Sequence, residues 1–158
     1  MNKVAIVGTG QTKFSKEDID IEKLLFESAN KCIQSTKNCD SNDIDGVLVS
    51  TNDNSKYMGA ILSETMGIQP KLTHTIEHLC SSGTSAIISA YSYISSGLCD
   101  MILISGVESA TNPGQVLKWD KTRGAFEHPI YWASMLTKLH KRKFNTTEEE
   151  IAIVSAKN

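Results

Sequence analysis

Apolar residues along this chain fall into short runs that alternate with longer amphipathic segments. Three of the short runs are rich in Val, Ile or Leu and end in glycine or a polar residue, which is typical of buried strands, and a fourth run, at residues 72–76, is strand-like. They predict strands at residues 3–8, 72–76 and 100–106, and a turn followed by a strand within residues 44–50.

Four segments show the apolar spacing of helices: residues 21–33, 58–66, 129–143 and 148 onward. Asp20 is placed to cap the first of these helices, and Gly67 to end the second. Thr147 and Glu150 form a capping box for the last. That last helix is still running where the sequence stops, which suggests a chain cut inside a larger architecture.

Residues 79–99 carry no charge, a length that would suit a membrane span. Seven serines make the segment too polar for lipid, so we expect a helix buried on all sides and ended by Gly97. The order of strands and helices predicts βαβ units, and therefore an α/β fold with a mainly parallel sheet.

Composition places the chain among globular proteins of ordinary character. It has 158 residues, 40% of them hydrophobic, and a net charge of −2, which gives no nucleic-acid or membrane-surface signature. The four cysteines form no C-x-x-C pair, so zinc is not expected. Because no signal peptide is evident, we expect a reducing cytoplasm.

Two other motifs could indicate a ligand site, and both are rejected. Gly8-Thr9-Gly10 lacks the third glycine of a dinucleotide fingerprint and the Gly-Lys-Ser/Thr of a P-loop. These glycines are expected to let the chain turn sharply off the first strand. His74 and His78 have a metal-like spacing but lack the Glu of H-E-x-x-H, so no metal is expected.

Cys80 is the candidate nucleophile. It follows the strand at 72–76 and precedes the uncharged helix, where free backbone N–H groups and the positive end of the helix dipole favour a thiolate. The small residues Ser81, Ser82 and Gly83 leave its sulfur accessible. The competing interpretation is a buried, inert cysteine.

Several motifs spread over the whole chain share one pattern. They are Cys80-Ser81-Ser82-Gly83 preceded by Glu77, the opening Val4-Ala5-Ile6-Val7-Gly8-Thr9-Gly10-Gln11-Thr12-Lys13-Phe14, Gly106-Val107-Glu108-Ser109, and residues 126–133, 147–150 and 156–158. Together they resemble the thiolase superfamily, in particular its archaeal acetyl-CoA acetyltransferase and sterol-carrier-protein-type branch.

The resemblance implies an α/β fold with the five-layered αβαβα thiolase architecture, of which this chain holds the N-terminal half. It implies an N-terminal α/β domain at residues 1–117 and the start of a loop domain, apparently truncated, at 118–158. It also implies a dimer or tetramer formed through the strand at 72–76, or a partner that supplies the other half.

The resemblance further implies acyl transfer through a thioester on Cys80, with a coenzyme A thioester as substrate and no permanently bound cofactor. The family's base and acid lie in Gly-His-Pro and Cys-x-Gly motifs, and both are absent here. His128-Pro129 follows Glu127 and sits at the loop-domain position, where His128 is an ordinary loop residue or a pocket residue. Cys80 is therefore the only catalytic residue carried over.

Three functions remain open at this point. The first is a thiolase-type acyl-CoA C-acyltransferase represented by its N-terminal portion. The second is a relative of the ketoacyl synthases, which also place a cysteine before a small-residue helix. The third is a non-catalytic, thiolase-like subunit that binds a partner.

Overall fold

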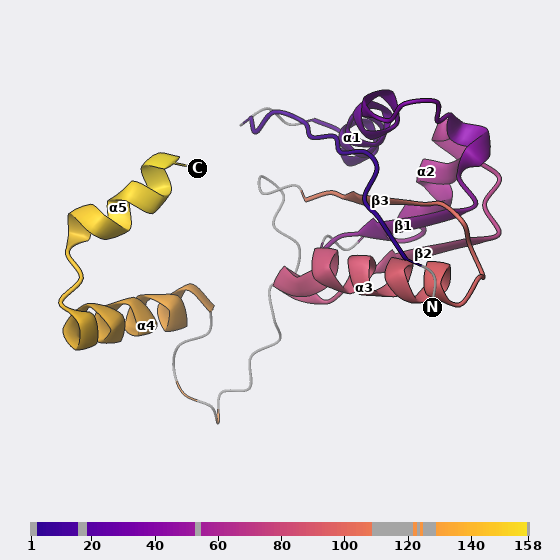
Figure 1. Ribbon diagram of the computed structural model, residues 1–158. Helices are drawn as coiled ribbons and strands as arrows, with labels where there is room; N and C mark the ends of the chain where they lie inside the picture. Colours follow the sequence, from indigo (N-terminus) through magenta and orange to yellow (C-terminus); the bar gives the residue numbers. More distant parts are fainter. Residues whose placement is uncertain are drawn as a thin grey trace. The chain divides into compact units, whose positions relative to one another are not determined.

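The computed structural model describes residues 3–15, 19–52, 55–108, 122, 124 and 129–157. The chain divides into two compact units, Met1–Gly114 and Gln115–Asn158. Figure 1 shows the elements of each. The interpretation of residues 118–158 as the start of a loop domain stays a prediction.

The first unit is built on a parallel sheet, as the strand–helix alternation predicts. Its strands are β1 (Gly46–Ser50), β2 (Leu72–Ile76) and β3 (Ile102–Gly106), in the order β2-β1-β3. Gly46 pairs with Leu72 on one side and with Ile102 on the other. Every residue of β1 is buried, which explains why this central strand has a continuous apolar run.

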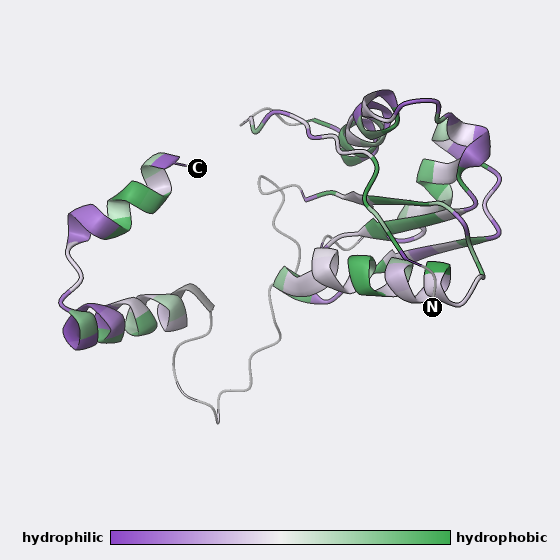
Figure 2. Ribbon diagram, viewed as in Figure 1, coloured by the Kyte–Doolittle hydropathy of each residue, from purple (hydrophilic) through white to green (hydrophobic). Residues whose placement is uncertain are grey.

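Helices cover both faces of this sheet. Helices α1 (Ile21–Ser35) and α2 (Met58–Met66) lie on one face, and α3 (Ser82–Ser95) lies on the other (Figure 1). Apolar residues gather between the layers, as the green segments of Figure 2 show. The core includes Leu25 of α1 and Leu62 of α2. The three layers confirm the expected α/β class.

The predicted ends of the first two helices are confirmed. The Asp20 carboxylate accepts a hydrogen bond from the Glu22 N–H at 3.0 Å, at the start of α1. Gly67 ends α2 in the left-handed conformation, with φ of 66°. A short 3₁₀ helix, Ser41–Asp43, follows α1 and carries its own capping box.

The predicted strand at residues 3–8 is wrong. This segment is irregular, and its apolar side chains are exposed: Ile6 by 80% and Val7 by 61%. A strand forms only where another strand pairs with it, and residues 3–8 pair with none of the three strands of the sheet. The chain contacts α1 from Gly8 onward, where the Thr9 N–H donates to Ser35 Oγ at 2.9 Å. Local β propensity alone did not reveal this.

The expected role of Gly8 and Gly10 as turn residues is also wrong. A Cβ on Gly10 would lie 2.3 Å from the Cys32 backbone nitrogen and 2.4 Å from the Ser28 carbonyl oxygen. A Cβ on Gly8 would lie 2.8 Å from the Cys32 carbonyl oxygen. These glycines are therefore needed for close approach to the backbone of α1.

Helix α3 was expected to be buried on all sides, and this is wrong for the chain as described. Its Ala86 and Ala90 are buried against the sheet, whereas Ile87, Ile88 and Tyr91 are 53%, 61% and 44% exposed. The absence of charged residues in α3 shows only that the helix could be buried. No described element of the first unit covers the face of α3 that points away from the sheet. Figure 2 shows apolar and weakly polar positions mixed along α3.

Asp45 holds together the amino ends of all three strands. Its carboxylate accepts hydrogen bonds from the Asp100 and Met101 N–H groups, at 3.0 to 3.2 Å, and pairs with Lys71 Nζ at 2.8 Å. Partial burial opposes ionisation, but the hydrogen bonds from Lys71 and from the two backbone groups prevail and lower the pKa of Asp45.

The second unit contains α4 (Pro129–Phe144) and α5 (Glu148–Lys157). The predicted capping box is confirmed, because Thr147 Oγ1 accepts from the Glu150 N–H and Glu150 Oε2 accepts from the Thr147 N–H. The last turn of α4 is basic, with Lys141, Arg142 and Lys143. Lys141 pairs with Glu148, and Lys143 lies over the Phe144 ring. No helix among the described residues is long and apolar enough to cross a membrane.

Candidate active site

Cys80 lies where the sequence places it, between β2 and α3. A single 3₁₀ turn, Leu79–Ser81, joins the strand to the helix, and Cys80 is its middle residue. The sulfur is exposed. The carboxyl ends of parallel strands meet at one edge of a sheet, so Cys80 stands beside the residues that follow β1 and β3.

The turn in front of Cys80 has an unusual backbone. Leu79 adopts a left-handed conformation with φ of 48°, a region that a bulky residue other than glycine rarely enters. The Leu79 N–H donates to Glu77 Oε1 at 2.8 Å, and the Leu79 carbonyl accepts from Ser82 Oγ at 2.7 Å. Side chains on both sides of Leu79 therefore hold this conformation.

The amino end of α3 lies next to Cys80, and the 3₁₀ turn already uses the N–H groups of Ser81 and Ser82, which donate to the His78 and Leu79 carbonyls. Ser81 occupies the N-cap position but makes no side-chain capping bond. The N–H groups of a helix's first turn and its dipole present partial positive charge to their surroundings. A negative charge on the Cys80 sulfur, or on a carbonyl oxygen reacting with it, would be stabilised here.

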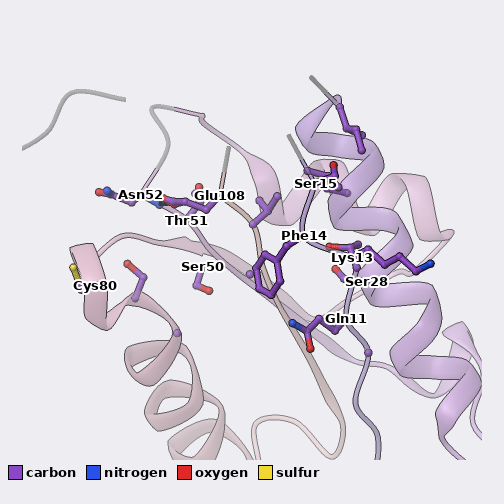
Figure 3. A pocket seen from close by; sticks show the side chains of 18 of the residues that line it. Gln11, Lys13, Phe14, Ser15, Ser28, Ser50, Thr51, Asn52, Cys80 and Glu108 are labelled. Carbon is purple, nitrogen blue, oxygen red and sulfur yellow. Dashed lines mark hydrogen bonds between the residues drawn. The ribbon is translucent and has the colours of Figure 1, made fainter. Parts of the chain in front are cut away.

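A cleft of about 770 Å³ opens at this edge of the sheet, a size suited to a small-molecule substrate. In Figure 3 the Cys80 sulfur lies at one rim, Phe14 and Gln11 lie on the segment across the cleft, and Ser50 lies between them. Phe14 is 93% exposed. The glycine-assisted packing of residues 8–10 on α1 thus positions one wall of the cleft.

Two residues of the cleft are joined in a way that sequence reasoning missed. The Asn52 N–H donates to both carboxylate oxygens of Glu108, at 3.2 and 3.3 Å, and Thr51 lies beside them (Figure 3). Asn52 follows β1 and Glu108 follows β3. A parallel sheet brings such residues together, so the strand order would have revealed this pair.

The two histidines near Cys80 have separate structural partners. The His74 ring on β2 packs near that of Tyr93, with 5.9 Å between centroids. His78 Nδ1 is hydrogen-bonded to Ser85 Oγ at 2.9 Å. Among the residues that the structure describes, no group of His, Cys, Asp and Glu side chains is arranged to hold a metal ion. His128 lies outside the described residues.

The other three cysteines differ from Cys80 in their surroundings. Cys99 is 1% exposed, and burial raises the pKa of its thiol. Burial also raises the pKa of Cys32 and of Cys39, whose sulfur lies 3.5 Å from that of Met101. All four cysteines are free. Cys80 is the exposed cysteine of the four, so its sulfur is the one most accessible to a substrate.

The fold and this edge of the sheet define a class: α/β proteins with an exposed cysteine between a parallel strand and the amino end of a helix. Within that class, residues 4–151 match the family described as "Thiolase, N-terminal domain". The chain belongs to the thiolase family, as its motifs predict, and corresponds to the family's N-terminal domain.

Two curated relatives agree with this assignment. The chain is 27% identical over 170 residues to the acetyl-CoA acetyltransferase of Methanocaldococcus jannaschii, a match covering 98% of this chain and 43% of that protein. It is 24% identical to the acetyl-CoA acetyltransferase of Methanothermobacter thermautotrophicus, covering 100% of this chain and 44% of that protein. The chain therefore spans less than half the length of these relatives.

A solved structure supports the fold. The acetyl-CoA acetyltransferase of Syntrophomonas wolfei matches 77% of this chain and 32% of its own chain, with a TM-score of 0.59 and 22% sequence identity. At this level of identity the likeness concerns the fold alone. It confirms the expected thiolase-like α/β architecture.

Proposed function

We propose that this chain carries the nucleophilic cysteine of a thiolase-type acyl-CoA C-acyltransferase, and that Cys80 is that cysteine. The proposal rests on one observation: Cys80 is an exposed thiol at a helix amino end, on the rim of a cleft that suits a small-molecule substrate. The acetyl-CoA acetyltransferases among its relatives support the acyl-transfer class.

In the proposed first half-reaction, the Cys80 thiolate attacks the carbonyl carbon of an acyl-CoA thioester. A new C–S bond forms to Cys80 while negative charge develops on the carbonyl oxygen, close to the amino end of α3. When the carbonyl re-forms, the bond to CoA breaks, and CoA leaves as a thiolate that takes up a proton. The products are acyl-Cys80 and free CoA, and no permanently bound cofactor is required.

The second half-reaction needs groups that this sequence does not contain. Acyl transfer to the α-carbon of a second acyl-CoA requires a base that removes a proton from that carbon. Thiolysis in the reverse direction requires a base that activates CoA. The Gly-His-Pro and Cys-x-Gly motifs that carry these groups in the family are absent. We propose that a complementing C-terminal half supplies them, so that this chain alone does not complete the cycle.

Domain roles form part of the same proposal. Residues 1–117 would form the α/β domain that holds Cys80, and residues 118–158 would begin the loop domain. The basic residues Lys138, Arg142 and Lys143 near the end of α4 would either meet the phosphates of coenzyme A or form a solvated helix end that complements the helix dipole.

The decisive test is the intact mass of the chain after incubation with acetyl-CoA. We expect the wild-type chain to gain one acetyl group and Cys80→Ala to gain none. Cys39→Ala is the matched control, because it removes another thiol, and it should be acetylated like the wild type. Acetylation that persists in Cys80→Ala would contradict the assignment of Cys80.

The two other functions give different results in the same experiment. A ketoacyl synthase-like enzyme would accept the acyl group from an acyl carrier protein in preference to coenzyme A. A non-catalytic subunit would gain no acyl group from either donor, even when a C-terminal thiolase half is added. The match to the thiolase family favours acyl-CoA over the carrier protein.

A further inference from the structure

The residue before Cys80 is held in a conformation that it would not adopt freely. A non-glycine residue at a positive φ costs free energy and persists only where surrounding contacts impose it. Leu79, with φ of 48°, is such a residue. It cannot rely on burial, because its side chain is 36% exposed.

Three short hydrogen bonds from two side chains surround Leu79. Glu77 Oε1 accepts from the Leu79 N–H at 2.8 Å. Ser82 Oγ accepts from the His78 N–H at 2.7 Å and donates to the Leu79 carbonyl at 2.7 Å. Ser82 is 6% exposed, so water cannot readily replace these bonds.

These contacts determine where the Cys80 sulfur points. Leu79 is the only residue between His78, at the end of the extended strand segment, and Cys80. A change in its φ and ψ would rotate Cys80 relative to the amino end of α3 and to the cleft. The position of the thiol therefore depends on the two side chains that hold Leu79.

We propose that Glu77 and Ser82 are positioning residues: they fix the left-handed turn at Leu79 and thereby hold the Cys80 thiol at the amino end of α3. The inference rests on the proposed function for its role in acyl transfer. Neither side chain reacts, and both act through the backbone of the turn.

Removing Glu77 distinguishes a positioning role from an electrostatic one, because the two roles predict opposite changes in the reactivity of Cys80. A carboxylate near a thiol disfavours the thiolate, so on charge alone its removal would make Cys80 more reactive. If Glu77 acts by holding Leu79, its loss makes Cys80 less reactive. Gln keeps the oxygen acceptor without the charge, so Glu77→Gln separates the two effects.

The experiment measures the rate of Cys80 alkylation by iodoacetamide in the full chain, located by peptide mass mapping. We expect Glu77→Ala to slow alkylation by about tenfold, the effect of losing one hydrogen bond, and Glu77→Gln to stay within about twofold of the wild type. Ser82→Ala loses two bonds and should be slowed at least as much. Glu64→Ala, at an exposed glutamate of α2, and Ser92→Ala, within α3, are controls expected to match the wild type.

Rates in Glu77→Ala that are unchanged or faster would overturn the inference, as would equal slowing in Glu77→Ala and Glu77→Gln. If Ser82→Ala does not fold, the comparison of Glu77→Ala with Glu77→Gln, both at an exposed residue, still tests the inference. Failure of wild-type acetylation together with the expected alkylation pattern would reject the proposed function alone. Acetylation of the wild type without any slowing in Glu77→Ala would reject this inference alone.

Discussion

At the residue scale, Gly10 shows how a single missing Cβ positions one wall of the cleft. The atoms that a Cβ would meet belong to the backbone of α1, which cannot move aside as a flexible side chain can. The segment carrying Gln11 and Phe14 can lie beside α1 only because Gly10 permits this approach. The glycine motif therefore contributes to the cleft although it binds no nucleotide.

We expect Gly10→Ala to lower the free energy of unfolding by about 1–3 kcal/mol, the usual cost of overpacking, measured by urea denaturation. Gly83→Ala is the matched control. A Cβ there has nothing within 4 Å, and alanine favours a helix, so this variant should be as stable as the wild type or more stable. Equal stability of Gly10→Ala and the wild type would contradict the close packing.

At the scale of elements, Asp45 joins three strands that are far apart in sequence. Its carboxylate receives hydrogen bonds from the residues that lead into β3 and an ion pair from Lys71, which leads into β2. The pKa of Asp45 is lower in the folded chain than in the unfolded chain. Asp45 therefore contributes its full stabilisation to the folded chain at pH values above its pKa in the unfolded chain. This stabilisation is lost as the pH falls through its pKa in the folded chain.

We expect the wild-type chain to lose stability more steeply than Asp45→Asn as the pH falls below about 4. At pH 7, Asp45→Asn should be about 1 kcal/mol less stable, since solvent screens the exposed Lys71 partner. Urea denaturation across this pH range measures both effects. Glu64→Gln, which removes an exposed carboxylate of α2, controls for the change in net charge. Parallel pH curves for wild type and Asp45→Asn would contradict the prediction.

Elements with strong local signals could be predicted from the sequence, and those that depend on distant partners could not. Asp20 marks the start of α1, and Gly67 marks the end of α2. Residues 3–8 have a Val-rich apolar run like that of β1, but pairing with another strand decides whether a strand forms. The contact between Asn52 and Glu108 likewise depends on strand order, which no local pattern contains.

At the scale of the whole molecule, the four cysteines sample very different surroundings. Cys80 is exposed on a turn, Cys32 and Cys39 are partly buried, and Cys99 has only 1% of its surface exposed. The Cys99 sulfur also lies 3.8 Å from the Asp45 carbonyl oxygen. A reagent can reach Cys99 only when the structure opens.

We expect iodoacetamide to modify Cys80 first and Cys99 last, with rates that differ by about tenfold or more. Peptide mass mapping over time gives the order. The denatured chain is the control, since all four thiols should then react at similar rates. Modification of Cys99 as early as Cys80 in the folded chain would contradict the burial described.

The central position of β1 has a consequence for synthesis on the ribosome. Gly46 emerges before both of its partners, Leu72 and Ile102, so the middle of the sheet is made first and its flanks later. Until β3 has been translated, the apolar strand β1 has one edge without a partner. Pairing β1 with β2 or β3 also requires closing a long chain segment, which is slow. The nascent chain is therefore most prone to aggregation, and most in need of chaperones, before residues 102–106 leave the exit tunnel and pair with β1.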